Sequence, residues 1–181
     1  MLRLAIDMDD VLADTDGKLV RWVRDSTGIV IPPDALVGRD ITEVLDRRTA
    51  LRLKDAMDQP DFFADIPPMA GSREAVRMLS WSYEIFIATA AMEFPNSFTA
   101  KFQWLRRYFD FLDPMHFVFC GDKSVLYTHY LIDDNPRHFE RFGGEAILFN
   151  APHNALVRGY RRARDWIDVT TMLTPAWEAD G

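Results

Sequence analysis

The sequence predicts an α/β protein in which helices cover both faces of a parallel sheet, with a small helical insertion near the N-terminus. Short apolar runs alternate with helix-length amphipathic stretches along most of the 181 residues, an order typical of right-handed βαβ units. The segment after the first strand is too long for a single crossover helix. Polar residues follow the strands at their carboxyl ends, which predicts a site along one edge of the sheet.

Four apolar runs, each ending abruptly in polar residues, mark expected strands, and a fifth strand is expected after the turn Gly143-Gly144. They are rich in Ile, Val, Phe and Leu, which is typical of strands buried in a parallel sheet. The expected strands are residues 2–6, 83–88, 116–120, 130–132 and 145–149.

The spacing of apolar residues predicts the helices between these strands. Phe98 and Phe102, followed by Leu105 and Phe109, recur at helical spacing. A second amphipathic stretch follows the turn at Gly71, and a third closes the chain. The expected helices of the core are residues 98–109, 73–81 and about 161–173.

The segment between Gly17 and Pro68 is expected to form the insertion. It carries its own helical patterns over residues 19–25 and 42–57. Paired prolines interrupt it, as expected where a chain leaves and re-enters a compact core. We therefore predict a core of residues 1–16 and 69–181 and a helical cap of residues 17–68.

The composition limits the partners of the protein. A formal net charge of −7 without a block rich in Lys or Arg argues against a nucleic-acid polymer, and no apolar run approaches the roughly 20 residues of a membrane span. Cys120 is the single cysteine, and the first residues lack the apolar stretch of a secretion signal. We expect a cytoplasmic protein that binds a small phosphorylated substrate. A homodimer is compatible with the sequence, which does not fix the oligomeric state.

The strand ends carry the residue types that phosphoryl transfer requires. The two acidic residues after the first strand are two positions apart, so both can face one ligand. Close carboxylates repel each other unless a cation lies between them, and Mg²⁺ binds carboxylates together with phosphate oxygens. An ammonium, a hydroxyl and backbone N–H groups are suited to hold the other phosphoryl oxygens. The residues concerned are Asp7, Asp9, Thr89, Ala90, Lys123, Asp133 and Asp134.

Each of these features alone has a plainer explanation. An isolated Asp-x-Asp is commonly a turn or a helix cap, a Thr that closes a strand fits β-propensity, and an Asp-Lys pair commonly marks a solvated loop. Asp133-Asp134 before Asn135-Pro136 can simply begin a helix. Their joint occurrence, at four strand ends that a parallel sheet aligns, favours a magnesium-dependent phosphatase.

The segment Asp7-Met8-Asp9-Asp10-Val11-Leu12-Ala13-Asp14 resembles the first motif of the haloacid-dehalogenase-like phosphatases, which have a Rossmann-like core. Thr89, Lys123 and Asp133-Asp134 match the other three motifs in order. Within that superfamily the chain resembles the 5'(3')-deoxyribonucleotidases, in its opening motif, in the stretch from Phe62-Phe63 to Gly71, and in Asn150-Ala151-Pro152-His153-Asn154.

The resemblance implies a role for each motif residue. Asp7 is expected to be the nucleophile that forms an aspartyl-phosphate, and Asp9 the general acid and then the general base. Thr89 and Lys123 are expected to hold the phosphate. The implied ligands of Mg²⁺ are Asp7, the carbonyl of Asp9, and Asp134, with Asp133 behind them. The implied substrate is a small deoxynucleoside monophosphate.

Two departures from the family pattern concern substrate contacts. The family often has Ser-Pro after the Thr of its second motif, whereas this chain has Ala90-Ala91. Family members place base-stacking aromatic residues in the insertion, roughly where this chain has Arg39-Asp40-Ile41-Thr42. The candidate substrate contacts of the cap are therefore Phe62, Phe63, Arg39 and Thr42, although aromatic residues of a small helical unit are more often its core.

Two other functions stay open. A related phosphatase acting on a sugar phosphate or another metabolite has the same motifs. A phospho-accepting signalling domain also combines acidic residues, a Thr, a Lys and magnesium, but its phospho-accepting Asp lies on a middle strand, after its acidic pair. Here Asp7-Met8-Asp9 comes first and Asp133-Asp134 last, an order that favours the phosphatase.

Overall fold

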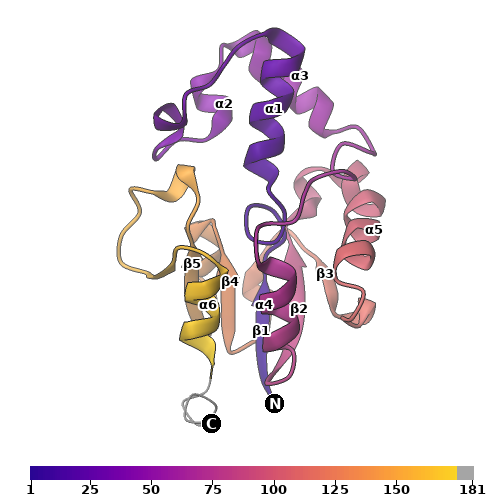
Figure 1. Cartoon of the computed structure of the whole chain (residues 1–181), viewed down its shortest axis with the longest axis vertical. Coiled ribbons are helices and arrows are strands. Elements are labelled where there is room, and N and C mark those ends of the chain that lie inside the picture. The colour runs from indigo at the N-terminus through magenta and orange to yellow at the C-terminus, as the bar shows by residue number, and fades with distance from the viewer. Residues whose placement is uncertain (175–181) are drawn as a thin grey trace.

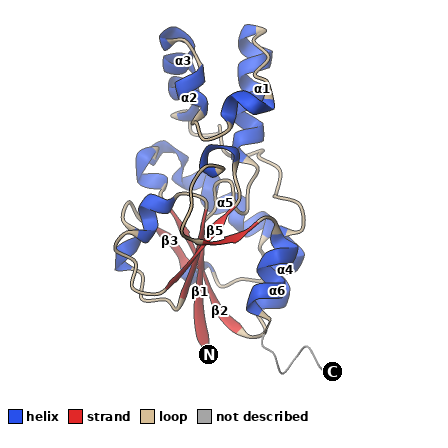
Figure 2. Ribbon diagram, turned by 90° about the vertical axis from the view of Figure 1, so that its left-hand side faces the viewer, coloured by secondary structure: helices blue, strands red, loops and turns tan. Residues whose placement is uncertain are grey.

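A computed structural model of the chain describes residues 1–174. Figures 1 and 2 show a parallel sheet that begins at the N-terminus, with helices packed against it and a group of helices beyond the end at which β1 finishes. The predicted core extends to residue 181, and its residues 175–181 lie outside the described part. None of the helices between residues 1 and 174 has the length and the apolar character needed to cross a membrane.

The sheet has six strands in the order β3-β2-β1-β4-β5-β6, and every neighbouring pair is parallel. This confirms the predicted α/β class. The central strands are apolar on both faces because both faces are covered; Leu4, Ala5 and Ile6 are completely buried. The strands are β1 (Leu2–Ile6), β2 (Tyr83–Thr89), β3 (Phe117–Phe119), β4 (Tyr130–Asp133), β5 (Glu145–Phe149) and β6 (Arg161–Ala163).

The strand order reverses between β1 and β4. The chain leaves β1 toward β2 and β3 on one side, and returns to add β4, β5 and β6 on the other. Ligands of open α/β sheets bind beyond the carboxyl ends of the strands at such a reversal. The register pairs Ile6 with Ile132, so the acidic residues that follow these two positions emerge side by side.

The two faces of the sheet are covered differently. The larger core cluster joins strand residues such as Leu4 and Ile6 to α4 (Ser72–Leu79), α5 (Phe98–Tyr108) and α6 (Trp166–Leu173). A smaller cluster on alternate strand residues, including Ala5 and Leu131, is closed by Phe139 of the 3-10 helix η6 (Pro136–Phe139). The strands β1 to β5 and the two predicted helices 73–81 and 98–109 coincide with the expected ranges within two residues at each end.

The predicted helix over residues 161–173 is wrong in its first part. Arg161–Ala163 forms the edge strand β6, paired with β5, and α6 begins only at Trp166. Two arginines are tolerated there because an edge strand is partly solvated. Arg162 donates to the Asn154 side chain at 2.7 Å, which fixes this edge to the loop after β5.

The helices of the insertion stand beyond the carboxyl ends of the strands, at the top of Figure 1. The pattern over residues 42–57 forms two helices rather than one, because Leu45 is extended and Asp46 caps the second helix, accepting from the N–H groups of Arg48 and Thr49. The α-helices of this segment are α1 (Thr15–Thr27), α2 (Ile41–Val44) and α3 (Arg47–Met57).

The two connections between the insertion and the sheet are hydrogen-bonded to each other. Ala13 and Pro68 form an antiparallel bridge. The N–H of Asp14 donates to the Pro67 carbonyl at 3.0 Å, and the N–H of Met69 donates to the Leu12 carbonyl at 2.6 Å. The insertion is therefore joined to the core through one paired segment next to the end of β1.

Candidate active site

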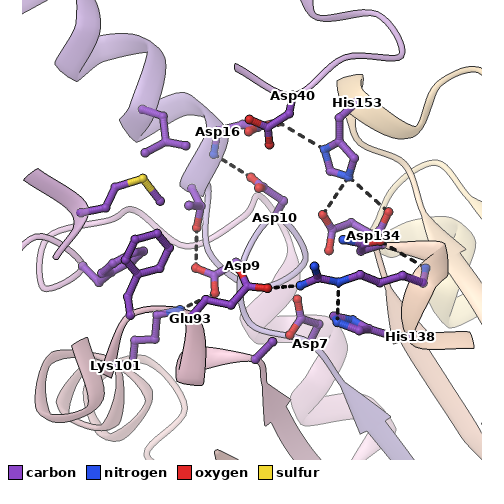
Figure 3. Close-up of a pocket in the computed structure, with 18 of the residues that line it drawn as sticks. Asp7, Asp9, Asp10, Asp16, Asp40, Glu93, Lys101, Asp134, His138 and His153 are labelled. Carbon is purple, nitrogen blue, oxygen red and sulfur yellow. Dashed lines mark hydrogen bonds and ion pairs between the residues drawn. The ribbon is translucent and has the colours of Figure 1, made fainter. Parts of the chain in front are cut away.

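A cavity of about 390 Å³ lies between the carboxyl ends of β1 and β4 and the insertion. Asp7, Asp134, Ala90 and Phe63 contribute to its wall. Figure 3 shows that its labelled side chains are mostly acidic, with Lys101, His138 and His153 among them. A cavity of this charge requires a cation before it can accept a phosphate ester.

The loop after β1 directs acidic side chains into the cavity. Its apolar residues Met8, Val11 and Leu12 are fully buried, whereas Asp7 and Asp9 line the cavity. Asp10 has a φ of 53°, a left-handed conformation that Asp tolerates better than most residues. Its carboxylate accepts a 2.7 Å hydrogen bond from the N–H of Asp16, which ties the loop to the start of α1.

Lys123 joins two of these carboxylates in the interior. Its Nζ lies 2.5 Å from Asp7 Oδ1 and 2.5 Å from Asp133 Oδ2, and its side chain is completely buried. The two carboxylates raise the pKa of Lys123 despite the opposing effect of burial. The ammonium is thus held in its charged form beside Asp7.

Burial raises the pKa of Asp7 well above its usual range, and Asp133, Asp134 and Asp9 raise it further, while Lys123 opposes them. For Asp133, burial also acts to raise the pKa, but Lys123 and His138 outweigh it and hold the pKa below its usual range. Burial, together with the neighbouring carboxylates, therefore disfavours the charged form of Asp7, an effect that a bound cation would oppose.

A divalent cation fits this cluster. Carboxylate oxygens of Asp7, Asp133 and Asp134 lie within 4.8 Å of one another. Asp133 is already saturated, since its Oδ2 contacts Lys123 and His138 and its Oδ1 accepts from the N–H of Asn135 at 2.9 Å. Asp7 and Asp134 are thus the carboxylates best placed to bind a cation, and Asp133 the one that positions Lys123.

Asp134 is held by the loop after β5. The amide of Asn154 donates to the Asp134 carbonyl at 2.7 Å, and His153 Nε2 lies 3.1 Å from Asp134 Oδ2. Burial acts to lower the pKa of His153, but Asp134 and Asp16 together raise it to about 11. The segment that contains His153 and Asn154 therefore orients Asp134 and supplies a positive charge beside it.

The Thr89 hydroxyl is free for a ligand. The residue is completely buried, and its Oγ1 is the one buried side-chain N or O atom, within residues 1–174, that has no hydrogen-bond partner. Buried polar groups are almost always paired in folded proteins. The orphaned hydroxyl at the end of β2, next to Ala90 of the cavity wall, indicates a missing acceptor or donor.

Lys101 is a site residue that the sequence analysis missed. Asp9 Oδ2 lies 2.5 Å from Lys101 Nζ, and Asp9 Oδ1 accepts from the Thr15 hydroxyl at 2.9 Å. The Lys101 side chain is 3% exposed and lies over the Phe63 ring at 4.4 Å. A signal exists in the sequence, because a charged residue stands at helical spacing from Trp104 and Leu105, both buried in α5.

The predicted substrate contacts of the cap are not gathered at one place. Phe63 lines the cavity, whereas Phe62 packs in the core and under Lys18. The Arg39 guanidinium donates to the carbonyl of Glu43 at 3.0 Å. Thr42 lies in an adjoining groove of the cap, where it donates to Asp40, the residue that caps α2. The roles of these four residues remain predictions.

Comparison with known proteins gives a consistent family. The family described as 5' nucleotidase, deoxy (pyrimidine), cytosolic type C matches residues 1–178. A Staphylococcus epidermidis protein provisionally named 5'(3')-deoxyribonucleotidase is 43% identical over 167 residues, covering 92% of this chain and 93% of its own. The 5'(3')-deoxyribonucleotidase of Bacillus subtilis is 31% identical over 170 residues, covering 94% of this chain and 97% of its own.

Solved structures share the fold at low sequence identity. A haloacid-dehalogenase-like family protein from Streptococcus pneumoniae has a TM-score of 0.62 at 12% identity, covering 95% of this chain and 98% of its own. A haloacid-dehalogenase-like hydrolase from Bacillus subtilis, solved with bound magnesium, has a TM-score of 0.60 at 11% identity, covering 96% and 99%.

Proposed function

Because the chain belongs to the 5'(3')-deoxyribonucleotidase family of haloacid-dehalogenase-like hydrolases, we propose that it hydrolyses small deoxynucleoside monophosphates with Asp7 as nucleophile. The chain is a nucleotidase-type phosphatase that acts on phosphomonoesters. The observation that carries the assignment of Asp7 is its contact with Lys123 at 2.5 Å, inside a cluster of carboxylates that lines the cavity.

Covalent catalysis divides the hydrolysis into two displacements. The Asp7 carboxylate attacks phosphorus, and the bond to the leaving oxygen breaks as the aspartyl-phosphate forms. A water molecule then attacks the same phosphorus, and the Asp7 carboxylate departs with inorganic phosphate released. Lys123 Nζ, already 2.5 Å from Asp7, offsets the negative charge of the phosphoryl oxygens in both steps.

Asp9 is the proposed general acid and base. Asp9 must carry a proton when substrate binds. It gives that proton to the leaving oxygen in the first step, and its carboxylate takes a proton from the attacking water in the second. Thr15 and Lys101 hold its two oxygens, so its orientation is set before substrate arrives. Lys101 also stabilises the carboxylate that remains once the proton has left.

We propose that the enzyme uses a divalent metal, Mg²⁺, which Asp7, Asp134 and the carbonyl of Asp9 would hold. When bound, such an ion neutralises carboxylates and phosphate oxygens so that an anion can approach another anion. Its preference for carboxylate oxygens matches the cluster, whose members lie within 4.8 Å of one another. Chelation should abolish turnover, and added Mg²⁺ should restore it, as measured by phosphate release.

Residues 17–68 are the proposed cap, which closes the cavity and contacts the leaving group. Leu19 of α1 and Met57 of α3 line the same cavity as Asp7. Closure over the substrate would exclude water from the first displacement. The paired connection at Ala13 and Pro68 links any such movement directly to the loop that carries Asp9.

Asp7→Asn tests the nucleophile. Turnover of deoxynucleoside monophosphates should fall below detection while the far-UV circular dichroism and the thermal midpoint stay near those of the wild type. Asp14→Asn, in the same loop but outside the carboxylate cluster, is the matched control for folding. Near-normal turnover by Asp7→Asn would refute the assignment.

A substrate panel tests the proposed class. Deoxynucleoside monophosphates should exceed sugar phosphates in kcat/KM, and a reversed ranking would favour the alternative phosphatase. A burst experiment separates an enzyme from a phospho-accepting domain, because an enzyme continues to release phosphate well beyond one equivalent per chain. Incorporation that stops near one equivalent would favour the signalling domain.

A further inference from the structure

Arg137 is the cation of the cavity that the mechanism above leaves unused. It lies in η6, three residues after Asp134, and lines the same cavity as Asp7 and Ala90. The other cations near Asp7 are committed: Lys123 contacts Asp7 and Asp133, Lys101 contacts Asp9, and His153 contacts Asp134. Arg137 differs because its side chain is 53% exposed, whereas the side chains of Lys123, Lys101 and His153 are 0%, 3% and 24% exposed.

The guanidinium is joined to the nucleophile by a short chain of contacts. Arg137 Nε donates to His138 Nε2 at 3.2 Å, and His138 Nδ1 lies 2.8 Å from Asp133 Oδ2. One histidine tautomer, with its proton on Nδ1, satisfies both contacts. Asp133 in turn contacts Lys123, which contacts Asp7. The imidazole of His138 and the carboxylate of Asp133 therefore link Arg137 to Lys123, the lysine that contacts Asp7.

The present partner of Arg137 is replaceable. Its Nη2 forms an ion pair with Glu93 Oε1, and both side chains are about half exposed. Glu93 ends η2 (Ala91–Glu93), the turn directly after Thr89 and Ala90. In Figure 3 one dashed line joins Glu93 to a guanidinium, and a second joins that guanidinium to His138, in agreement with the two contacts of Arg137. An exposed pair of this kind contributes little to stability.

Phosphate is a better partner for this guanidinium than a single carboxylate. A guanidinium has five N–H donors in a planar fork that fits phosphate oxygens, and the two bonds described use only Nε and Nη2. Ala90 offers a backbone N–H but no side-chain donor at the cavity wall. The exposed guanidinium can supply the donors which that wall lacks.

We propose that Arg137 binds the phosphate group of the substrate and that Glu93 is the counterion it leaves to do so. This inference rests on the proposed function, since it concerns the same cavity. Before substrate binds, the Glu93 carboxylate forms an ion pair with the Arg137 guanidinium. On binding, the phosphate displaces that carboxylate, and His138 keeps Nε in place while the Nη groups turn to the phosphate oxygens.

The test compares Arg137→Gln, Arg137→Lys and Glu93→Gln in the full chain with Mg²⁺ present. The readouts are the KM for a deoxynucleoside monophosphate and the Ki for inorganic phosphate as product inhibitor. Arg137→Gln should raise both about tenfold or more, as expected for loss of a charged hydrogen bond, with a smaller change in kcat. Arg137→Lys should recover part of the loss. Glu93→Gln should lower the Ki, because the competing carboxylate is gone.

The exposed pair of Arg161 with Glu145, at 2.6 Å, provides the matched control: Arg161→Gln should change neither constant. A Ki for Arg137→Gln within twofold of the wild type would overturn the proposal, as would a Glu93→Gln variant that weakens phosphate binding as much as Arg137→Gln does. Calorimetric binding of inorganic phosphate to Asp7→Asn, with and without Arg137→Gln, tests the inference without turnover. If Arg137→Gln does not weaken phosphate binding in this experiment, the proposed role of Arg137 is wrong, whether or not the proposed reaction is correct.

Discussion

The carboxyl edge of the sheet and the insertion that faces it hold their polar side chains in different ways. At the sheet edge, Asp7, Lys123 and Asp133 are buried and contact one another. On the insertion, Arg39 and Thr42 are exposed and contact mainly their own segment. The proposed reacting groups are therefore fixed by the core, whereas Arg39 and Thr42, two predicted substrate contacts, are held mainly by their own segment. Substitutions at the sheet edge should mainly change kcat, and substitutions on the insertion should mainly change the preference among substrates.

The largest effect that sharpens this comparison is expected for Lys123→Met. Removal of the ammonium leaves two buried carboxylates without their partner, which should cost about 3–5 kcal/mol of unfolding free energy. Activity should be lost as well, because Lys123 is the proposed partner of the phosphoryl oxygens. Urea unfolding measures the first effect and phosphate release the second. If Lys123→Met had the unfolding free energy of the wild type, the contacts of Lys123 with Asp7 and Asp133 would not stabilise the sheet edge.

A smaller effect is expected for Lys101→Met, which loosens Asp9 without removing it. Asp9→Asn should reduce kcat by roughly 10²–10⁴-fold, the usual contribution of a general acid or base. Lys101→Met should reduce kcat less than Asp9→Asn does, leave KM nearly unchanged and alter the pH profile of kcat. Lys101→Arg should recover part of the activity. An unchanged pH profile of kcat would mean that Lys101 only packs against the Phe63 ring and does not affect the protonation of Asp9.

Arg39→Ala and Thr42→Ala test the insertion side. Each should leave the unfolding free energy within about 0.5 kcal/mol of the wild type, as is usual for exposed positions. Their kcat should stay near the wild-type value, and any change should appear in the ranking of deoxynucleoside monophosphates by KM. A large loss of kcat in either variant would contradict the prediction that the insertion affects substrate preference rather than the reaction rate.

The smallest effect concerns an ion pair at the start of α6, outside the residues that line the cavity. The hydrogen bond from Arg164 lowers the pKa of Asp168 to about 2. A lowered folded-state pKa means that this carboxylate stabilises the protein above its unfolded pKa of about 3.8, a contribution lost as the pH falls through about 2. Arg164→Gln should return the pKa toward its usual value, as NMR titration would show, with little change in activity. A pKa that stays near 2 would assign the shift to other neighbours.

The sequence predicted the sheet well where strands are buried on both faces, as in β1 and β5, whose apolar runs have sharp ends. It missed β6, because Arg161 and Arg162 give an edge strand no apolar signature. It also merged α2 and α3, since the periodicity continues across the cap at Asp46. The spacing of apolar residues therefore does not predict a strand at a solvated sheet edge, or a helix end that a capping side chain determines.

The same reasoning explains the site. The motif residues could be located because strand ends place them, whatever the detailed packing. Lys101 and Arg137 come from segments between strands, and only their contacts with Asp9 and Glu93 reveal them. His153 lies 3.1 Å from Asp134, a contact that the positions of the two residues in the sequence do not indicate. Such pairings depend on long-range geometry that spacing along the chain does not encode.

The paired segment at Ala13 and Pro68 has a consequence for how such enzymes diversify. Both ends of the insertion leave the sheet at one point, and the bonds of Asp14 to Pro67 and of Met69 to Leu12 close that point from the core side. A whole cap from a relative can therefore be grafted between Asp16 and Pro67, which keeps the contacts of Thr15 with Asp9 and of Asp16 with Asp10 in the loop after β1. Replacement of this single module is a route by which one hydrolytic centre acquires new substrates.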